Sequence, residues 1–112
     1  MPTPATGHRL YNDSMFTQIR QAQSQLREIC LRRHIRRLEL FGSAAREDFG
    51  PESDLDFLVE FETTPDLKNY FGLKEDLEAL FGRTVDLVML EAVRNPYVRA
   101  AIERDRQLLY AA

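Results

Sequence analysis

The sequence RLELFGSAAREDFGPESDLDFLVEF, residues 37–61, decides the fold of this chain. Residues 37–41 alternate between polar and apolar side chains, which predicts a strand that ends at Gly42. Residues 53–61 alternate again, with apolar side chains on one face and acidic ones on the other, which predicts a second strand. The segment 43–52 between them predicts a short helix to residue 48 and then a loop. These residues therefore point to a domain that mixes helices and strands.

Periodicity and capping signals predict five more elements around this stretch. They are a helix from residue 13 or 14 to about 34, a helix over 67–81 ended by Gly82, a strand over 84–90, a helix opened by Asn95-Pro96 with Val98, Ala101 and Ile102 inward, and a short strand over 107–112. The apolar positions of the helix over 67–81 are Leu67, Tyr70, Phe71, Leu73, Leu77, Leu80 and Phe81. The strand over 84–90 is almost entirely apolar, which is typical of burial on both faces. We therefore expect a single α/β (α+β) domain over residues 13–112, in which helices flank a small mixed sheet, preceded by a flexible tail over 1–12.

Length and composition exclude several classes of protein. A chain of 112 residues has room for one core, and 44% hydrophobic residues are typical of a globular protein. The net charge of −3 hides a segregation, with +5 in residues 1–46, −10 in 47–92 and +2 in 93–112. The sequence has neither a membrane span nor a signal-peptide core, which predicts a soluble, cytoplasmic protein without a membrane partner. The single cysteine, Cys30, lies on an apolar helix stripe and is predicted to be a core residue.

Three aspartates are the candidate metal ligands. Asp54 and Asp56 are separated by one residue on a strand, so both carboxylates face the same way. Asp86 interrupts an apolar strand, where an unpaired charge would be costly, so we expect a metal ion or a basic group beside it. If the two strands are neighbours, three carboxylates converge at a buried site. Such oxygen donors suit Mg²⁺, with the phosphates of a nucleoside triphosphate as further ligands.

Gly42-Ser43 is the candidate phosphate-binding turn. It stands between a strand and a predicted helix, where glycine permits close approach of the backbone and the helix N-terminus offers N–H groups to an anion. Arg46 lies one turn further on and is a candidate for a contact with the phosphates, although a salt bridge with Asp48 or Glu52 is equally compatible with its position.

Together, Gly42-Ser43, ten intervening residues, the Asp54-x-Asp56 pair and Asp86 on a later strand resemble the signature of the nucleotidyltransferase superfamily related to DNA polymerase beta. The segments LFGSAARED, SDLDFLVEF and GRTVDLVML look most like the minimal nucleotidyltransferases of prokaryotes, from about Phe16 to the C-terminus. The resemblance implies a fold with a single nucleotidyltransferase domain. It also implies an antitoxin that is paired with an HEPN-domain ribonuclease toxin.

The resemblance further implies a reaction, the transfer of AMP from ATP to a hydroxyl of the toxin, with tyrosine as the expected acceptor, which neutralises the toxin. Asp54, Asp56 and Asp86 would be catalytic residues and ligands of two Mg²⁺ ions, and Asp86 is also a candidate general base, while Gly42, Ser43 and Arg46 would bind the nucleotide. An alternative within this family is an antitoxin that neutralises its toxin by binding alone. A different alternative, a nucleic-acid-binding module, is suggested by the arginines between residues 27 and 37 but lacks an aromatic-basic stacking pattern.

The arginines of the first helix, Arg20, Arg27, Arg32 and Arg33, have two further interpretations. They form a solvated helix face, or they meet an acidic surface of a partner protein.

Overall fold

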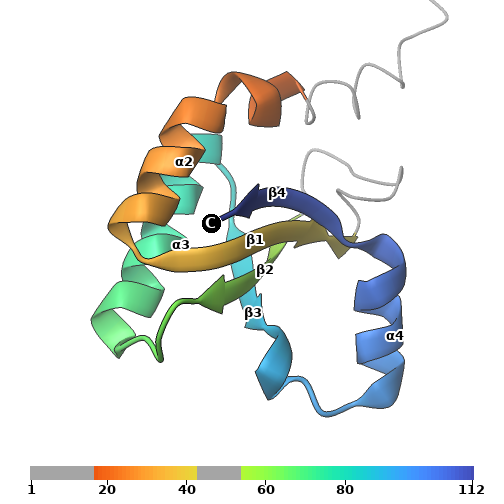
Figure 1. Ribbon diagram of the computed structural model, residues 1–112. Helices are drawn as coiled ribbons and strands as arrows, with labels where there is room; N and C mark the ends of the chain where they lie inside the picture. The colour runs from red at the N-terminus through yellow and green to blue at the C-terminus, as the bar shows by residue number, and fades with distance from the viewer. Residues whose placement is uncertain (1–16, 43–53) are drawn as a thin grey trace, which may run out of the picture.

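The computed structural model describes residues 17–42 and 54–112. A four-stranded mixed sheet forms its centre, in the order β3-β2-β1-β4 (Figure 1). The strands are β1 (Ile35–Phe41), β2 (Leu55–Phe61), β3 (Val85–Met89) and β4 (Gln107–Ala111). β1 runs antiparallel to both β2 and β4, whereas β3 runs parallel to β2. The predicted mixed sheet with flanking helices is therefore confirmed.

Besides the helical residues 17–21, three α-helices and one short 3-10 helix flank this sheet in the described part of the chain. They are α2 (Gln23–Arg32), α3 (Leu67–Phe81), α4 (Pro96–Asp105) and the 3-10 helix η3 (Leu90–Ala92). α2 and α3 lie together beside the sheet, and α4 lies on the other side of the molecule (Figure 1). The main core forms between α2, α3 and the sheet, where Leu26, Phe57 and Leu77 are fully enclosed. The opposite face carries buried Leu58 and Glu39, and the buried Ile102 of α4 lies outside the main core cluster.

Capping residues set the ends of the later helices as predicted. The Asn95 side chain accepts hydrogen bonds from the backbone N–H groups of Tyr97 and Val98 at 2.8 and 3.3 Å, with Pro96 in the first turn of α4. Gly82 ends α3 with φ = 67°, in the left-handed region that glycine adopts at least cost. These two signals are local, which is why the sequence is sufficient to locate them.

The first helix is interrupted, which the sequence pattern did not predict. Residues 17–21 are helical, Ala22 forms a turn, and α2 begins at Gln23. The apolar stripe nevertheless continues across the turn, because Ile19, Ala22, Leu26 and Cys30 are all buried. The predicted core position of Cys30 is thus confirmed, and burial raises the pKa of its thiol to about 12.

Two helix predictions are wrong in detail. Leu67 and Phe71, expected on the apolar face of α3, are 75% and 51% exposed. Val98, expected to point inward from α4, is 45% exposed, while Ile102 is buried as predicted. Together with Met89 and Val93, the exposed residues of α3 line an apolar groove of about 430 Å³. The helical period identifies an apolar stripe, but it does not determine how much of that stripe the sheet covers.

The prediction that β3 is buried on both faces is also wrong. β3 is an edge strand that pairs only with β2, and Asp86 in its middle is exposed while Val85 and Leu87 on either side are buried. The expectation that Asp86 is a buried charge is therefore wrong, because its side chain lies at the surface.

The arginines at the end of α2 have partners within the chain. Arg33 Nε donates to the Asp76 carboxylate of α3 at 2.9 Å, and Arg32 Nη2 does so at 3.1 Å. Gly72 makes room for this contact, because a Cβ at that position would overlap the Arg33 guanidinium. These two arginines tie α2 to α3.

Several predictions lie outside the described residues. They are the flexible tail over 1–12, the start of the domain at residue 13, the short helix over 43–48 and the loop over 49–52. Within the described residues, no helix combines the length and apolar character that crossing a membrane requires.

Candidate active site

The paired aspartates lie at the start of β2. Asp54 is exposed and immediately precedes the strand, and Asp56 is partly buried within it. Leu55 between them is fully buried in the core, so the two aspartates extend to the other side of the strand. This placement agrees with the period-two argument from the sequence.

The register of the sheet brings Asp86 beside this pair. In the parallel ladder between β2 and β3, Asp56 is the partner of Asp86, with Leu55 opposite Val85 and Phe57 opposite Leu87. Neighbouring strands are about 4.8 Å apart, and residues at the same level direct their side chains to the same face. The sheet therefore brings Asp56 and Asp86 together on one face, as expected if their strands are neighbours.

Gly42 lies against the same carboxylate. Phe41, the last residue of β1, is the partner of Asp56 in the antiparallel ladder, and Gly42 follows it with φ = 77°. A Cβ at Gly42 would overlap the Asp56 carboxylate. Glycine is thus required here both for its backbone conformation and for space. Ser43 and Arg46, the other candidate nucleotide contacts, lie outside the described residues.

The carboxylates form an open set rather than a closed cage. Among the described residues, no three His, Cys, Asp or Glu side chains lie close enough together to enclose a metal ion. Mg²⁺ is usually held by one or two carboxylates, with substrate phosphates and water completing its shell. Oxygen donors on two adjacent strands at the surface therefore fit a magnesium ion that binds together with a nucleotide.

Helix α3 supports β3 on both sides of Asp86. The Tyr70 hydroxyl donates to the Leu87 carbonyl oxygen at 2.6 Å, and Glu78 Oε2 accepts from the Val85 N–H at 3.0 Å. These bonds satisfy backbone groups on the outer edge of β3, which would otherwise be open to pairing with another chain. The strand segment that carries Asp86 is consequently held in place from the helix.

Lys74 lies between these two side chains on α3. Its Nζ donates to Glu78 Oε2 at 3.0 Å, and this hydrogen bond raises the pKa of Lys74, with a further contribution from the negative charge of Asp86. Burial raises the pKa of Tyr70, and Asp86 contributes to this shift also. Hydrogen bonds from Val85 and then Lys74 lower the pKa of Glu78. Sequence analysis missed this group, because its only signal is the i, i+4, i+8 spacing.

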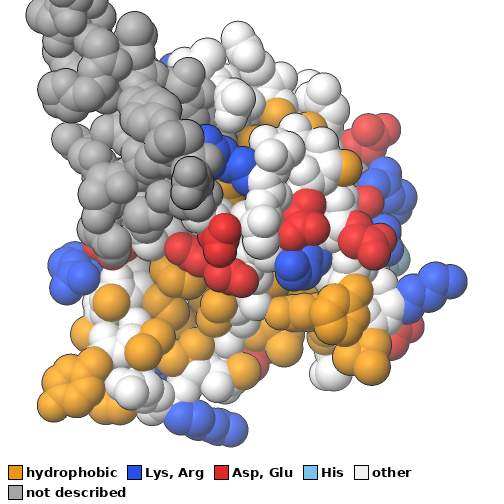
Figure 2. Space-filling view, turned by 180° about the vertical axis from the view of Figure 1, so that it is seen from behind, with side chains coloured by type: hydrophobic (Ala, Val, Ile, Leu, Met, Phe, Trp, Pro, Cys, Tyr) orange, Lys and Arg blue, Asp and Glu red, His pale blue; other side chains and the backbone are white. Residues whose placement is uncertain are grey.

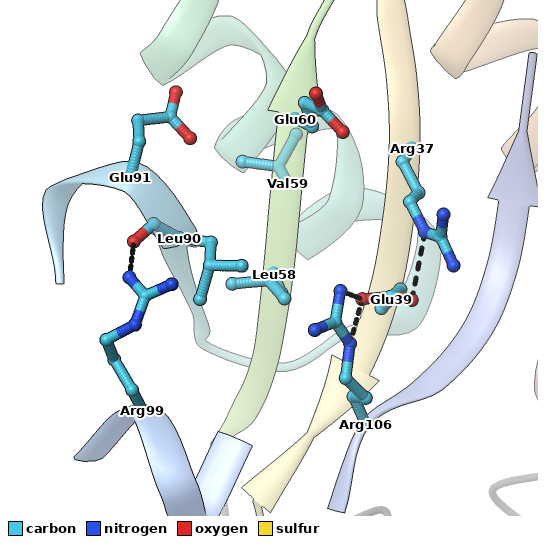
Figure 3. A pocket seen from close by; sticks show the side chains of 9 residues that line it. All are labelled: Arg37, Glu39, Leu58, Val59, Glu60, Leu90, Glu91, Arg99 and Arg106. Carbon is cyan, nitrogen blue, oxygen red and sulfur yellow. Dashed lines mark hydrogen bonds and ion pairs between the residues drawn. The ribbon is translucent and has the colours of Figure 1, made fainter. Parts of the chain in front are cut away.

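A pocket of about 240 Å³ lies further along the sheet (Figure 3). Its lining includes Leu58, two residues beyond Asp56 on β2, and Leu90, four residues beyond Asp86. Alternation along the strand places Asp56 and Leu58 on one face. Arg99 lies at one end of the pocket, where its Nη1 donates to the Leu90 carbonyl oxygen at 2.9 Å. Asp54, Asp56 and Asp86 are not among the residues that line this pocket.

Glu39 is a buried carboxylate in this pocket. Its side chain lies between Arg37 and Arg106, with Oε2 3.0 Å from Arg37 Nε and Oε1 2.8 Å from Arg106 Nε (Figure 3). Sequence analysis did not identify Glu39, because it stands in a strand that alternates between polar and apolar residues, where a charged residue is expected on the exposed face. Only the packing shows that this carboxylate is buried.

A mixed sheet that carries a glycine turn and paired carboxylates on adjacent strands defines a class of protein that handles nucleotides. The family model "Nucleotidyltransferase domain" matches residues 23–109. The chain belongs to this nucleotidyltransferase family, in its minimal form.

Two curated relatives are named after the same enzyme activity, that of a protein adenylyltransferase. The chain is 39% identical over 93 aligned residues to a protein of Methanocaldococcus jannaschii named as a protein adenylyltransferase, covering 73% of this chain and 92% of the relative. It is 37% identical over 76 residues to the protein adenylyltransferase MntA of Thermococcus cleftensis, covering 68% and 74%. The family to which this chain belongs is therefore one of enzymes.

Solved structures share the fold. One described as a minimal nucleotidyltransferase superposes with a TM-score of 0.66 at 34% identity, covering 79% of this chain and 89% of that one. A complex of a tri-AMPylated Shewanella oneidensis HEPN toxin with its MNT antitoxin contains a chain that superposes with a TM-score of 0.61 at 18% identity, covering 84% and 73%. At this low identity, the second similarity concerns the fold alone.

Proposed function

We propose that this protein is an antitoxin that transfers AMP from ATP, with Mg²⁺ bound, to a tyrosine hydroxyl of an HEPN-domain ribonuclease toxin. The observation that carries the proposal is the register that places Asp56 opposite Asp86, with Gly42 against the Asp56 carboxylate. The relatives named as protein adenylyltransferases and the fold shared with an antitoxin bound to an AMPylated toxin support it.

The carboxylates have separate roles in this proposal. Asp54 and Asp56 would hold Mg²⁺ together with the triphosphate, and Asp86 would be a ligand of the Mg²⁺ ion on the acceptor side. When bound, Mg²⁺ neutralises charge on the triphosphate and on the departing pyrophosphate. The backbone after Gly42, with Ser43 and Arg46, binds the phosphates.

The reaction is an in-line displacement at the α-phosphorus of ATP. The tyrosine oxygen forms the new bond to phosphorus, the bond from phosphorus to the oxygen bridging to the β-phosphate breaks, and pyrophosphate leaves. Asp86 accepts the proton of the tyrosine hydroxyl as general base. Its exposure at the edge of the sheet leaves room for an acceptor that arrives on another protein.

The test is AMP transfer measured by mass spectrometry. Wild-type protein, ATP and Mg²⁺ are incubated with an HEPN ribonuclease, and the toxin is expected to gain the mass of AMP on a tyrosine. We expect Asp56→Asn to reduce the rate by at least about 100-fold, because a metal ligand is lost, and Glu75→Gln, a change at an exposed position of α3, to leave it unchanged. Equal labelling by wild type and Asp56→Asn would contradict the proposal. Full neutralisation by an Asp56→Asn variant that transfers no AMP would instead identify an antitoxin that acts by binding alone.

A further inference from the structure

We infer that Lys74 is a positioning residue that acts as the counter-ion of Asp86 in the metal-free protein and thereby lowers the affinity of the site for a divalent cation. This inference rests on the proposed function, because it takes Asp86 as a metal ligand. It concerns α3, which holds the edge of β3 but carries none of the candidate metal ligands.

The geometry begins with three side chains on one face of α3. Tyr70, Lys74 and Glu78 are spaced four residues apart, so they form a row along the helix. The outer two bond to the backbone of the residues on either side of Asp86, at 2.6 Å to the Leu87 oxygen and 3.0 Å from the Val85 nitrogen. The middle side chain is therefore held at the level of Asp86.

The charges around Lys74 support its role as a shared counter-ion. Its ammonium group has three N–H donors, and the 3.0 Å bond to Glu78 uses one of them. The negative charge of Asp86 contributes to raising the pKa of both Lys74 and Tyr70, so the three side chains interact electrostatically. On the face seen in Figure 2, acidic side chains form a row with a basic side chain among them. A divalent cation that binds Asp86 must compete with this positive charge.

Removing the charge of Lys74 should therefore strengthen metal binding. The full chain, without nucleotide, is titrated with Mn²⁺ as the probe, and the dissociation constant is measured by calorimetry or by the electron paramagnetic resonance of free Mn²⁺. We expect Lys74→Met to bind Mn²⁺ about three- to tenfold more tightly at low salt, and the difference to shrink as salt screens the charges. Lys68→Met, at an exposed position near the start of the same helix, is the matched control and should bind like wild type.

A second variant separates this role from general damage to the fold. Glu78→Gln frees Lys74 to interact with Asp86 alone, so Mn²⁺ should bind more weakly than in wild type. Lys74→Met should then strengthen binding by a larger factor in the Glu78→Gln background than in wild type, because coupled sites are not additive. Damage to the β3 edge would instead weaken Mn²⁺ binding in both single variants.

The possible outcomes distinguish this inference from the proposed function. If wild type binds Mn²⁺ and Lys74→Met binds it with the same affinity as Lys68→Met, the inference is overturned and the proposed function stands. If wild type binds Mn²⁺ only together with ATP, the inference is overturned and the proposed function stands. If wild type binds no Mn²⁺ with or without ATP, both are overturned.

Discussion

Glu39 shows how a single buried charge is accommodated in this small core. Its side chain is only 4% exposed, and Arg106 and Arg37 both bond to it, from the end of α4 and from β1. Glu39 also lies at the junction of three strands, since it pairs with Leu58 of β2 and Leu108 of β4. Removing one partner of a buried ion pair leaves the other uncompensated, which costs more than the pair itself contributes.

We therefore expect Glu39→Gln to lower the free energy of unfolding by about 2 kcal/mol, less than the loss of a fully buried pair because Arg37 remains half-exposed. Glu60→Gln on the neighbouring strand is the control. Its carboxylate is 52% exposed and lies 3.9 Å from Arg36, so its loss should cost less than about 0.5 kcal/mol. Urea unfolding of both variants measures the difference, and equal midpoints would show that Glu39 contributes nothing beyond a surface charge.

At the scale of the element, α3 contains a glycine that its helical propensity does not favour. Gly72 lies in the middle of the helix, where alanine would normally be more stable by about 1 kcal/mol. The Arg33 guanidinium occupies the space over this residue and bonds to Asp76 beside it. Gly72 therefore lowers the intrinsic stability of α3, but it leaves room for the Arg33–Asp76 contact that joins α3 to α2.

We therefore expect the effect of Gly72→Ala on the free energy of unfolding to depend on whether Arg33 is present. In wild type, the gain in helical propensity should be cancelled by displacement of the guanidinium, so that the stability changes by less than about 0.5 kcal/mol. In an Arg33→Ala background, the same substitution should stabilise the protein by about 1 kcal/mol. Thermal or urea unfolding of the four proteins gives the coupling, and an equal gain in both backgrounds would refute this account of Gly72.

At the scale of the whole molecule, a few polar contacts join segments that are far apart in the chain. Arg32 and Arg33 reach Asp76 from α2 to α3, and Arg106 reaches Glu39 from the end of α4 to β1. Burial opposes ionisation of Asp76, but the hydrogen bonds from Arg33 and Arg32 outweigh it, so the pKa of Asp76 is lowered. The connection between the two helices therefore depends on pH.

A carboxylate whose pKa is lower in the folded state stabilises the protein above its unfolded pKa, which is about 3.9 for aspartate. This contribution is lost as the pH falls below that value and through the folded pKa. We expect Asp76→Asn to destabilise the protein by about 1 kcal/mol at pH 7, and the gap between variant and wild type to close below about pH 3. Urea unfolding at several pH values measures the gap, and a gap that stays constant down to pH 2 would exclude the ion pair as its source.

The candidate site was predicted from the sequence to the extent that its signals are local. Period-two spacing placed Asp54 and Asp56 on one side of a strand, and the Gly42 turn was recognised from its position after an alternating segment. The contacts of Tyr70 and Glu78 with β3 were not predicted, because they depend on the angle at which α3 crosses the sheet. The exposure of Phe71 was missed for the same reason.

The sequence by itself determined the strands, the ends of the later helices and the residue types at the site, since hydrophobic period, capping and turn chemistry act over a few neighbouring residues. Only the tertiary structure decided the order of the strands, which makes β3 an edge and exposes Asp86 where burial on both faces was expected. Strand order depends on which apolar faces pack together across the whole chain, and the pattern of a single strand does not indicate which strands lie beside it. The same packing brought Asp86 to the level of Asp56 and placed Tyr70 and Glu78 of α3 against the backbone on either side of it.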